Sequence, residues 1–192
     1  MNLALFDFDG TLTRKDSLEE FIIFAVGRRE YYFKLLFFSP IYIMYKLKIM
    51  HNSKAKEMLL SLYFSGVRES SFKEIALKFS NEKINSILRE EIYEKLQEHK
   101  RNGDRVIVVS ASMKCWLKPW TDKENVELLS TEMEFIDTRF SGHFKTPNCH
   151  GVEKLNRIKE ILNLNDYEKV YAYGDSSGDE QMLEVADVKV RL

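Results

Sequence analysis

The chain contains 192 residues, of which 44% are hydrophobic, and its formal net charge is −1. This length suits a single domain with a hydrophobic core, and the near-neutral charge predicts no electrostatic attraction to nucleic acid. The two cysteines, Cys115 and Cys149, form no CxxC pair, so we expect neither a disulfide framework nor a zinc site. The N-terminus reaches Asp7 without a basic segment, so we expect no signal peptide and a cytoplasmic location.

The first predicted element is a buried strand. Residues 3–8 form an apolar run that ends at an Asp-Gly-Thr turn. Helical periodicity then extends from residue 17 to residue 100, and Ser17 with Glu20 three positions later is typical of a capped helix start. One apolar helical face recurs over residues 84–96. An Asn-Gly-Asp turn at 102–104 is expected to close this helical block.

The most apolar part of the helical block lies between residues 31 and 50. Its inner run, residues 35–45, carries no charge, but it is too short to span a bilayer and Pro40 interrupts it. One hypothesis is a buried helix pair, and the other is a helix that lies in the plane of a membrane surface. The second hypothesis depends on flanking lysines and on tyrosines that suit a membrane interface, namely Lys34, Lys46, Lys48, Tyr31, Tyr32, Tyr42 and Tyr45.

After residue 104, short apolar strands alternate with helices. This alternation predicts an α/β fold with a parallel sheet and helices on both faces, interrupted once by the helical block. We therefore predict a core of residues 1–12 and 105–192, with a helical cap of residues 13–104 inserted after the first strand. The predicted strands are 105–110, 126–130, 170–173 and 188–190, with a hairpin at 133–144 and helices at 152–162 and 179–184.

Two carboxylates follow the first strand, and ligands of such sheets bind beyond the carboxyl ends of strands. Asp7 and Asp9 could flank a loop that faces water, or they could perform phosphoryl transfer. In the second case Asp7 is the nucleophile that forms an aspartyl-phosphate, and Asp9 protonates the leaving alcohol and later activates water. Gly10 would permit close approach of the backbone to the substrate, and Thr11 would add a hydroxyl donor.

Ser110, Ala111 and Lys154 are further candidates for binding phosphate. Ser110 could cap the next helix, or its hydroxyl and the backbone N–H groups after it, beginning at Ala111, could bind phosphate oxygens. Lys154 lies in the first turn of a predicted helix, where a lysine opposes the helix dipole. It could be an ordinary surface lysine, or a cation that offsets the repulsion between the nucleophile and the phosphate.

The loop of residues 174–179 contains Asp175 and Asp179. A role in capping the next helix accounts for Asp179, but it leaves Asp175 unexplained directly after an apolar strand. Two or three carboxylates, with waters and a phosphate oxygen, form the octahedral oxygen site that Mg²⁺ prefers. The sequence therefore predicts Mg²⁺ as a cofactor beside Asp7.

Together these clusters resemble the motifs of the haloacid dehalogenase superfamily, in its phosphatase branch. Their order, spacing and positions at strand ends all agree, and the resemblance covers the chain from end to end. It implies a Rossmann-like core with a type-one cap, as in the phosphoserine-phosphatase-like subfamily IB. Asp7 to Thr11 matches the first motif, DxDGT, Ser110 the second, Lys154 the third and Gly174 to Asp179 the fourth, GDxxxD.

The resemblance also implies a role for each matched residue. Mg²⁺ would be held by Asp7, by the backbone carbonyl of Asp9 and by Asp175, with Asp179 in support. Ser110 would bind the phosphoryl group, which Lys154 would neutralise.

The presence of Asp9 distinguishes between the reactions known in this superfamily. Dehalogenases lack the second aspartate and need no metal, so the resemblance implies a phosphatase. P-type ATPases carry a lysine-threonine pair after the nucleophile, which differs from the sequence here. Transfer of the phosphoryl group to an acceptor other than water stays open. A non-catalytic binding protein of the same fold is the alternative from another class, although it is expected to lose motif residues that this chain keeps.

The resemblance is compatible with two classes of substrate. Asp16 occupies a place comparable to the acidic residue that binds the substrate amine in phosphoserine phosphatases, Arg68 is a candidate for their cap arginine, and Gly178 replaces a common asparagine. Residues 31–50 and 148–154 are similar to bacterial phosphatidylglycerophosphatases, which act on lipid phosphate at the membrane. We therefore expect a bacterial enzyme for a phosphorylated metabolite or a lipid phosphate, with residues 31–50 as the candidate for peripheral membrane contact.

Overall fold

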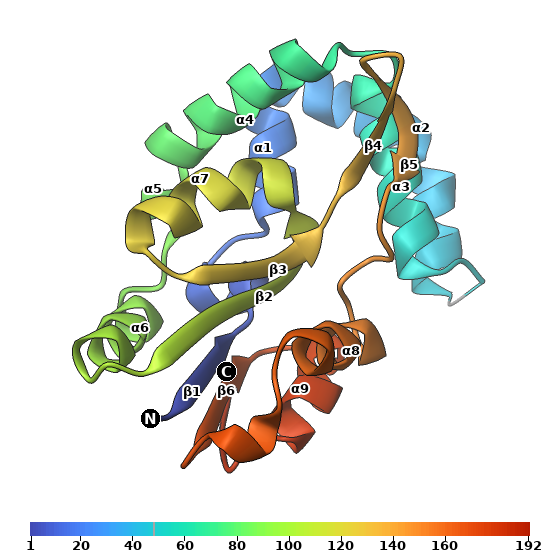
Figure 1. The fold of residues 1–192 in the computed structure, drawn as a ribbon. Coiled ribbons are helices and arrows are strands. Elements are labelled where there is room, and N and C mark those ends of the chain that lie inside the picture. Colours follow the sequence, from blue (N-terminus) through green and yellow to red (C-terminus); the bar gives the residue numbers. More distant parts are fainter. Residues whose placement is uncertain (48) are drawn as a thin grey trace.

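The computed structural model describes residues 1–47 and 49–192. A five-stranded parallel sheet forms its centre, with strand order β3-β2-β1-β6-β7, and a separate two-stranded hairpin pairs β4 with β5 (Figure 1). The strands are β1 (Leu3–Phe6), β2 (Arg105–Met113), β3 (Glu127–Thr131), β4 (Met133–Ile136), β5 (Arg139–Phe144), β6 (Val170–Gly174) and β7 (Val188–Arg191).

Helices cover both faces of the sheet, and a further group of helices lies above its carboxyl-terminal edge (Figure 1). The helices are α1 (Ser17–Val26), α2 (Arg28–Lys46), α3 (Asn52–Phe64), α4 (Glu69–Glu82), α5 (Ile84–Ile87), α6 (Glu90–Arg101), α7 (Lys114–Glu124), α8 (Val152–Ile161) and α9 (Glu180–Glu184). The predicted α/β fold, with a helical cap inserted after the first strand, is confirmed.

The central strand β1 is buried on both faces, as expected for a parallel sheet covered by helices. Leu3 and Leu5 belong to the same apolar cluster as Ile158 of α8 and Met182 of α9. Alternate residues of a strand point to opposite faces, and accordingly Phe6 belongs to the other cluster, which includes α6 and α7. The sheet therefore holds the end of β1 rigidly between two layers of helices.

The cap and the core share one continuous apolar cluster. Phe21 of α1 stacks on Trp116 of α7, with ring centroids 4.4 Å apart, and α4 packs along α7. Phe21 also contacts Phe72 and Phe79 of α4. The cap is therefore packed firmly on the core at this side.

The boundary residues between the core and the cap remain a proposal. Helix α6, which we assigned to the cap, packs against β1 and β2. The β4–β5 hairpin, which we assigned to the core, packs against α3 in the cap. These contacts favour a cap that ends at about residue 88 and is completed by the hairpin.

Local differences from the prediction have clear physical causes. Helix α1 is capped by Asp16 rather than by Ser17, because the Asp16 carboxylate accepts the N–H groups of Leu18 and Glu19. The expected helical face over residues 84–96 is interrupted where Leu88 adopts an extended conformation and forms a bridge with Thr13.

Helix α2 resolves the two hypotheses for residues 31–50 only in part. Tyr31 and Phe38 are buried against the rest of the cap, but most of the large apolar side chains between Tyr32 and Ile49 are exposed. A buried helix pair therefore accounts for one face of α2 and not for the other. Within the described ranges, no helix combines the length and apolarity needed to cross a membrane. Lys48 and the side chains of Tyr45 and Lys46 lie outside the described residues.

Candidate active site

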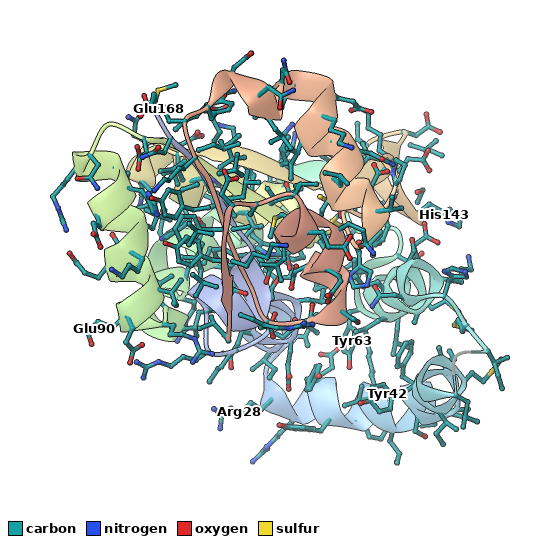
Figure 2. The ribbon with its side chains drawn as sticks, turned by 90° about the horizontal axis from the view of Figure 1, so that it is seen from below. Arg28, Tyr42, Tyr63, Glu90, His143 and Glu168 are labelled. Atoms are coloured by element: carbon teal, nitrogen blue, oxygen red, sulfur yellow. The ribbon has the colours of Figure 1, made fainter. Side chains whose placement is uncertain are left out.

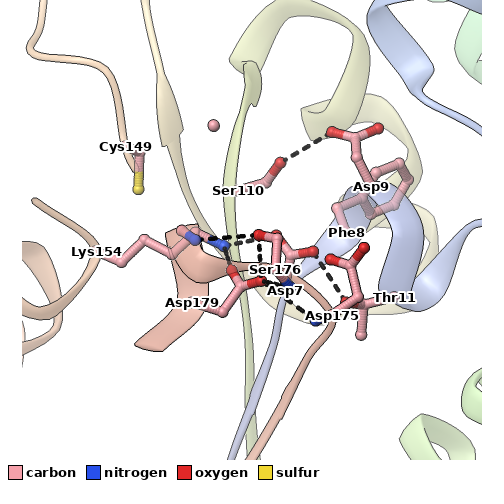
Figure 3. Close-up of polar contacts among 12 residues, drawn as sticks. Asp7, Phe8, Asp9, Thr11, Ser110, Cys149, Lys154, Asp175, Ser176 and Asp179 are labelled. Atoms are coloured by element: carbon pink, nitrogen blue, oxygen red, sulfur yellow. Dashed lines mark hydrogen bonds and ion pairs between the residues drawn. The ribbon is translucent and has the colours of Figure 1, made fainter. Parts of the chain in front are cut away.

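The candidate nucleophile Asp7 directly follows β1 and is 6% exposed. Its N–H donates to the carbonyl of Tyr173, which aligns it with the end of β6. Its carboxylate has one partner at each oxygen (Figure 3). The Nζ of Lys154 lies 2.5 Å from Oδ1, and the hydroxyl of Thr11 donates to Oδ2 at 3.0 Å. The carboxylate is thus held in one orientation.

The turn after Asp7 requires glycine at position 10. Gly10 has φ = 87°, a left-handed conformation that favours glycine. A Cβ at this position would also lie 2.3 Å from Oδ2 of Asp175, which is closer than any real contact. The guanidinium of Arg89 donates to the carbonyls of Gly10 and Thr11 and ties the turn to the start of α6.

The carboxylate of Asp9 points away from Asp7 toward the second strand. Its Oδ2 accepts the hydroxyl of Ser112 at 2.5 Å, and its Oδ1 accepts the N–H of Ser17 at 2.6 Å. Burial raises the pKa of Asp9, the charge of Asp16 raises it further, and hydrogen bonds from Ser112 and Ser17 oppose the shift. A raised pKa favours the protonated form that a general acid needs.

Ser110 and Ala111 lie near the end of β2. The hydroxyl of Ser110 is buried, accepts the N–H of Ser112 at 2.9 Å and lies 3.5 Å from Oδ2 of Asp9. The carbonyl of Ala111 accepts the Nζ of Lys56 and the hydroxyl of Thr131. Ser110 is therefore beside Asp9 in the structure, and its binding of phosphate remains a prediction.

Lys154, in the first turn of α8, is 1% exposed and forms ion pairs with Asp7 and Asp179 (Figure 3). Burial opposes its charge, but the two carboxylates outweigh burial and raise the pKa of the ammonium. The interpretation of Lys154 as an ordinary surface lysine is thus excluded.

Asp179 supports the loop that carries Asp175. Its Oδ1 lies 2.6 Å from Nζ of Lys154, and its Oδ2 accepts the N–H groups of Asp175 and Ser176 and the Ser176 hydroxyl. Burial disfavours its ionised form, but Lys154 and these hydrogen bonds outweigh burial and lower its pKa. Because both oxygens are occupied, Asp179 suits a supporting role.

One carboxylate oxygen each from Asp7, Asp175 and Asp179 lies within 4.8 Å of the others. Oδ1 of Asp175 is buried and has no hydrogen-bond partner among the described residues. Burial raises the pKa of Asp7 to about 7, and burial followed by the charge of Asp179 raises the pKa of Asp175. Such carboxylates are an oxygen donor set that needs a cation, so the residues fit Mg²⁺. The side chain of Asp9 lies outside this cluster, and the role of its carbonyl remains a prediction.

Two residues proposed for substrate binding have structural contacts of their own. Asp16 caps α1, and it also borders a pocket of about 750 Å³ between α1, α2 and α3. Arg68 forms a backbone bridge with Arg139 of the hairpin. At Gly178, a Cβ would lie 2.2 Å from Cε1 of His150, so the imidazole occupies the space that a side chain at position 178 would need.

Several residues of the site received no role at the site in the sequence analysis. Ser17 and Ser112 are both buried and hydrogen-bonded to Asp9 and to each other. Arg89 holds the nucleophile turn, and Lys56 brings a cation from α3 to the end of β2. No local pattern marks these roles, because Ser112, Arg89 and Lys56 bond to residues far away in the chain, and Ser17 bonds to Asp9 through its backbone N–H.

The haloacid dehalogenase-like hydrolase family matches residues 4–184 of this chain. The chain belongs to this family. Protein CicA of Caulobacter vibrioides is 31% identical over 189 residues, which cover 97% of this chain and 84% of CicA.

Solved structures show the same fold at lower identity. A Bordetella pertussis protein of unknown function is 24% identical, with a TM-score of 0.77 over 98% of this chain and 88% of that one. A phosphoserine phosphatase, solved as a phospho-aspartyl intermediate analogue, is 22% identical, with a TM-score of 0.63 over 97% of this chain and 84% of that one. The chain therefore has the fold of a phosphoserine-phosphatase-like protein.

Proposed function

We propose that this protein is a Mg²⁺-dependent phosphatase that hydrolyses phosphate monoesters through an aspartyl-phosphate on Asp7. The observation that carries the proposal is the buried Asp7 carboxylate, held by Lys154 and Thr11 beside the unpartnered oxygen of Asp175. A structural carboxylate needs neither a neighbouring metal-ligand set nor a second, protonatable aspartate. A phosphatase of the same fold, solved as an analogue of its phospho-aspartyl intermediate, supports the same intermediate by analogy.

The reaction has two steps. First, a carboxylate oxygen of Asp7 attacks phosphorus, the bond from phosphorus to the leaving oxygen breaks, and Asp9 gives its proton to that oxygen. In the second step water attacks the phosphorus of the aspartyl-phosphate, Asp9 accepts a proton from the water, and phosphate and the free Asp7 carboxylate are released. To reach the substrate, Asp9 exchanges its hydrogen bond from Ser112 for one with the leaving oxygen.

Charge is the main obstacle to the first step, since both Asp7 and the phosphate are anionic. Lys154 offsets part of this repulsion from its buried position. Asp7 and Asp175, with the backbone carbonyl of Asp9 and support from Asp179, would hold Mg²⁺. When bound, Mg²⁺ supplies further positive charge for the phosphoryl oxygens.

The test is hydrolysis of p-nitrophenyl phosphate with Mg²⁺, together with mass spectrometry of acid-quenched enzyme. We expect release of phosphate by the wild type and a phosphate adduct on the peptide that contains Asp7. The Asp7→Asn variant is expected to fold, to lose turnover and to form no adduct. Substantial turnover by Asp7→Asn would remove Asp7 as the nucleophile.

The same experiment separates the other two functions. A binding protein of this fold would release no phosphate from any member of a panel of phosphorylated metabolites and lipid phosphates. A phosphotransferase would release p-nitrophenol in excess of phosphate when an acceptor alcohol is present. Equal amounts of the two products are expected for a hydrolase.

Lipid phosphate is the second candidate substrate beside small metabolites. The pocket beside Asp16 favours it, because its walls are mainly apolar and include Tyr31, Leu35, Phe38 and Leu59. Asp16 also acts on the general acid, since its charge raises the pKa of Asp9. An apolar leaving group could therefore occupy this pocket near the reacting atoms. Higher kcat/KM for long-chain than for short-chain alkyl phosphates would support this substrate.

A further inference from the structure

Helix α2 presents an apolar face to solvent. We define the α2 face as six side chains of α2 and the segment directly after it that are each more than half exposed: Phe33, Leu36, Phe37, Ile43, Leu47 and Ile49. The rings of Phe33 and Phe37 contact each other, with centroids 5.4 Å apart, so this end of the patch is continuous. Figure 2 shows α2 at an edge of the molecule, with Arg28 at one end and Tyr42 toward the other.

The opposite face of the same helix is also apolar. Tyr31 and Phe38 are buried, and the hydroxyl of Tyr63 in α3 donates to the carbonyl of Tyr31. One apolar stripe is enough to attach a helix to a protein core, so the second stripe is not needed for folding. Contiguous exposed apolar surface of this kind marks an interaction site.

The charge around the α2 face indicates what covers it. Residues 28–56 contain seven lysines and arginines and one glutamate, a net charge of +6. The rest of the chain then carries −7 of the total of −1. Basic charge beside an exposed apolar helix complements an anionic lipid surface, where lysines and arginines each add to the binding. Two copies of this face would repel each other.

We propose that the α2 face docks this protein on an anionic lipid bilayer, with α2 in the plane of the membrane surface. The apolar side chains would enter the boundary between headgroups and acyl chains, and the basic residues would remain at the headgroups. The pocket beside Asp16 is lined by Tyr32 and Leu36 of the same helix, so it opens next to the docked surface. Access of a lipid phosphate to Asp7 by this route rests on the proposed function, whereas docking does not.

The experiment is co-sedimentation of the full chain with vesicles of phosphatidylcholine alone or with about one third phosphatidylglycerol. We expect binding to the anionic vesicles to be at least about tenfold stronger, and to weaken as salt is added. The double variant Phe33→Glu, Phe37→Glu is expected to lose at least about tenfold in binding, since it puts two charges into the apolar face.

Leu77→Glu is the matched control, because Leu77 is an exposed apolar residue on another helix, α4. It should bind like the wild type, and circular dichroism should show that all variants are folded. Hydrolysis of soluble p-nitrophenyl phosphate is measured in parallel and should not change. Vesicle binding without hydrolysis would sustain docking while removing the phosphatase proposal.

Three results would overturn docking. The wild type could fail to sediment with anionic vesicles, or the double variant could bind as tightly as the wild type. Alternatively, sedimentation velocity could show a dimer that the double variant dissociates, in which case the α2 face is covered by a second copy.

Discussion

The Nζ of Lys154 lies 2.5 Å from Oδ1 of Asp7, although 147 residues separate the two in the chain. The ammonium also contacts Asp179, so a single buried cation joins the end of β1 to the loop after β6. The charge of the site is therefore balanced by Lys154, Asp7 and Asp179 together.

Removing Lys154 is therefore expected to affect both folding and turnover. Lys154→Met leaves two buried carboxylates without their cation, which should lower the free energy of unfolding by about 3 kcal/mol. Turnover of p-nitrophenyl phosphate should fall at least about 100-fold, because the variant loses a fixed charge at the phosphate. Guanidinium unfolding and steady-state kinetics measure the two effects. The matched control, Lys159→Met at an exposed position of the same helix, should change neither. An unchanged midpoint for Lys154→Met would contradict the ion pairs described.

Asp175 should control the response to Mg²⁺. A ligand that binds only the folded state stabilises it, by about 2.7 kcal/mol at a concentration 100 times its Kd. We expect Mg²⁺ to raise the Tm of the wild type and to have no such effect on Asp175→Asn. Asp166→Asn, at an exposed position outside the site, is the control and should respond like the wild type. Stabilisation of Asp175→Asn by Mg²⁺ at wild-type concentrations would place the metal elsewhere.

Gly10→Ala should be more damaging than substitution of a glycine in open space. Gly103 also has a left-handed conformation, with φ = 73°, but nothing lies within 4 Å of a Cβ built there. Gly103→Ala should therefore cost only about 1 kcal/mol from its backbone conformation. Gly10→Ala adds a collision with Asp175, so both stability and Mg²⁺ affinity should fall further, as measured by unfolding and by calorimetric titration. Equal behaviour of the two variants would show that the turn and Asp175 are not in contact.

Asp16 can be tested for two roles with two variants. Asp16→Ala removes the cap of α1 and should lower the free energy of unfolding by about 1 kcal/mol, whereas Asp16→Asn keeps a capping oxygen and should cost little. If the charge of Asp16 binds a cationic group of the substrate, Asp16→Asn should raise KM for amine-containing phosphates only. If Asp16→Asn leaves the KM unchanged both for phosphoserine and for an amine-free analogue, Asp16 does not bind the substrate amine.

Much of the fold was predictable because local patterns report local structure. The apolar strands, the turn at 102–104 and the hairpin at 133–144 were each indicated by a few adjacent residues. The boundaries depended on distant partners. Asp16 rather than Ser17 caps α1, because the N–H and hydroxyl of Ser17 are taken by Asp9 and Ser112. Helix α6 packs on the sheet, although periodicity alone placed it with the cap.

The chemistry that we propose for this chain was predictable from the residues that follow its strands. Asp7, Asp9, Lys154 and Asp175 follow strands or begin a helix in an order that brings them to one edge of a parallel sheet, and side-chain type at such an edge depends little on distant packing. The contacts of these side chains, by contrast, follow only from the tertiary structure. The burial of Lys154, the orientation of Asp9 and the exposure of α2 depend on atoms brought together from far apart in the chain, and no local pattern encodes those distances.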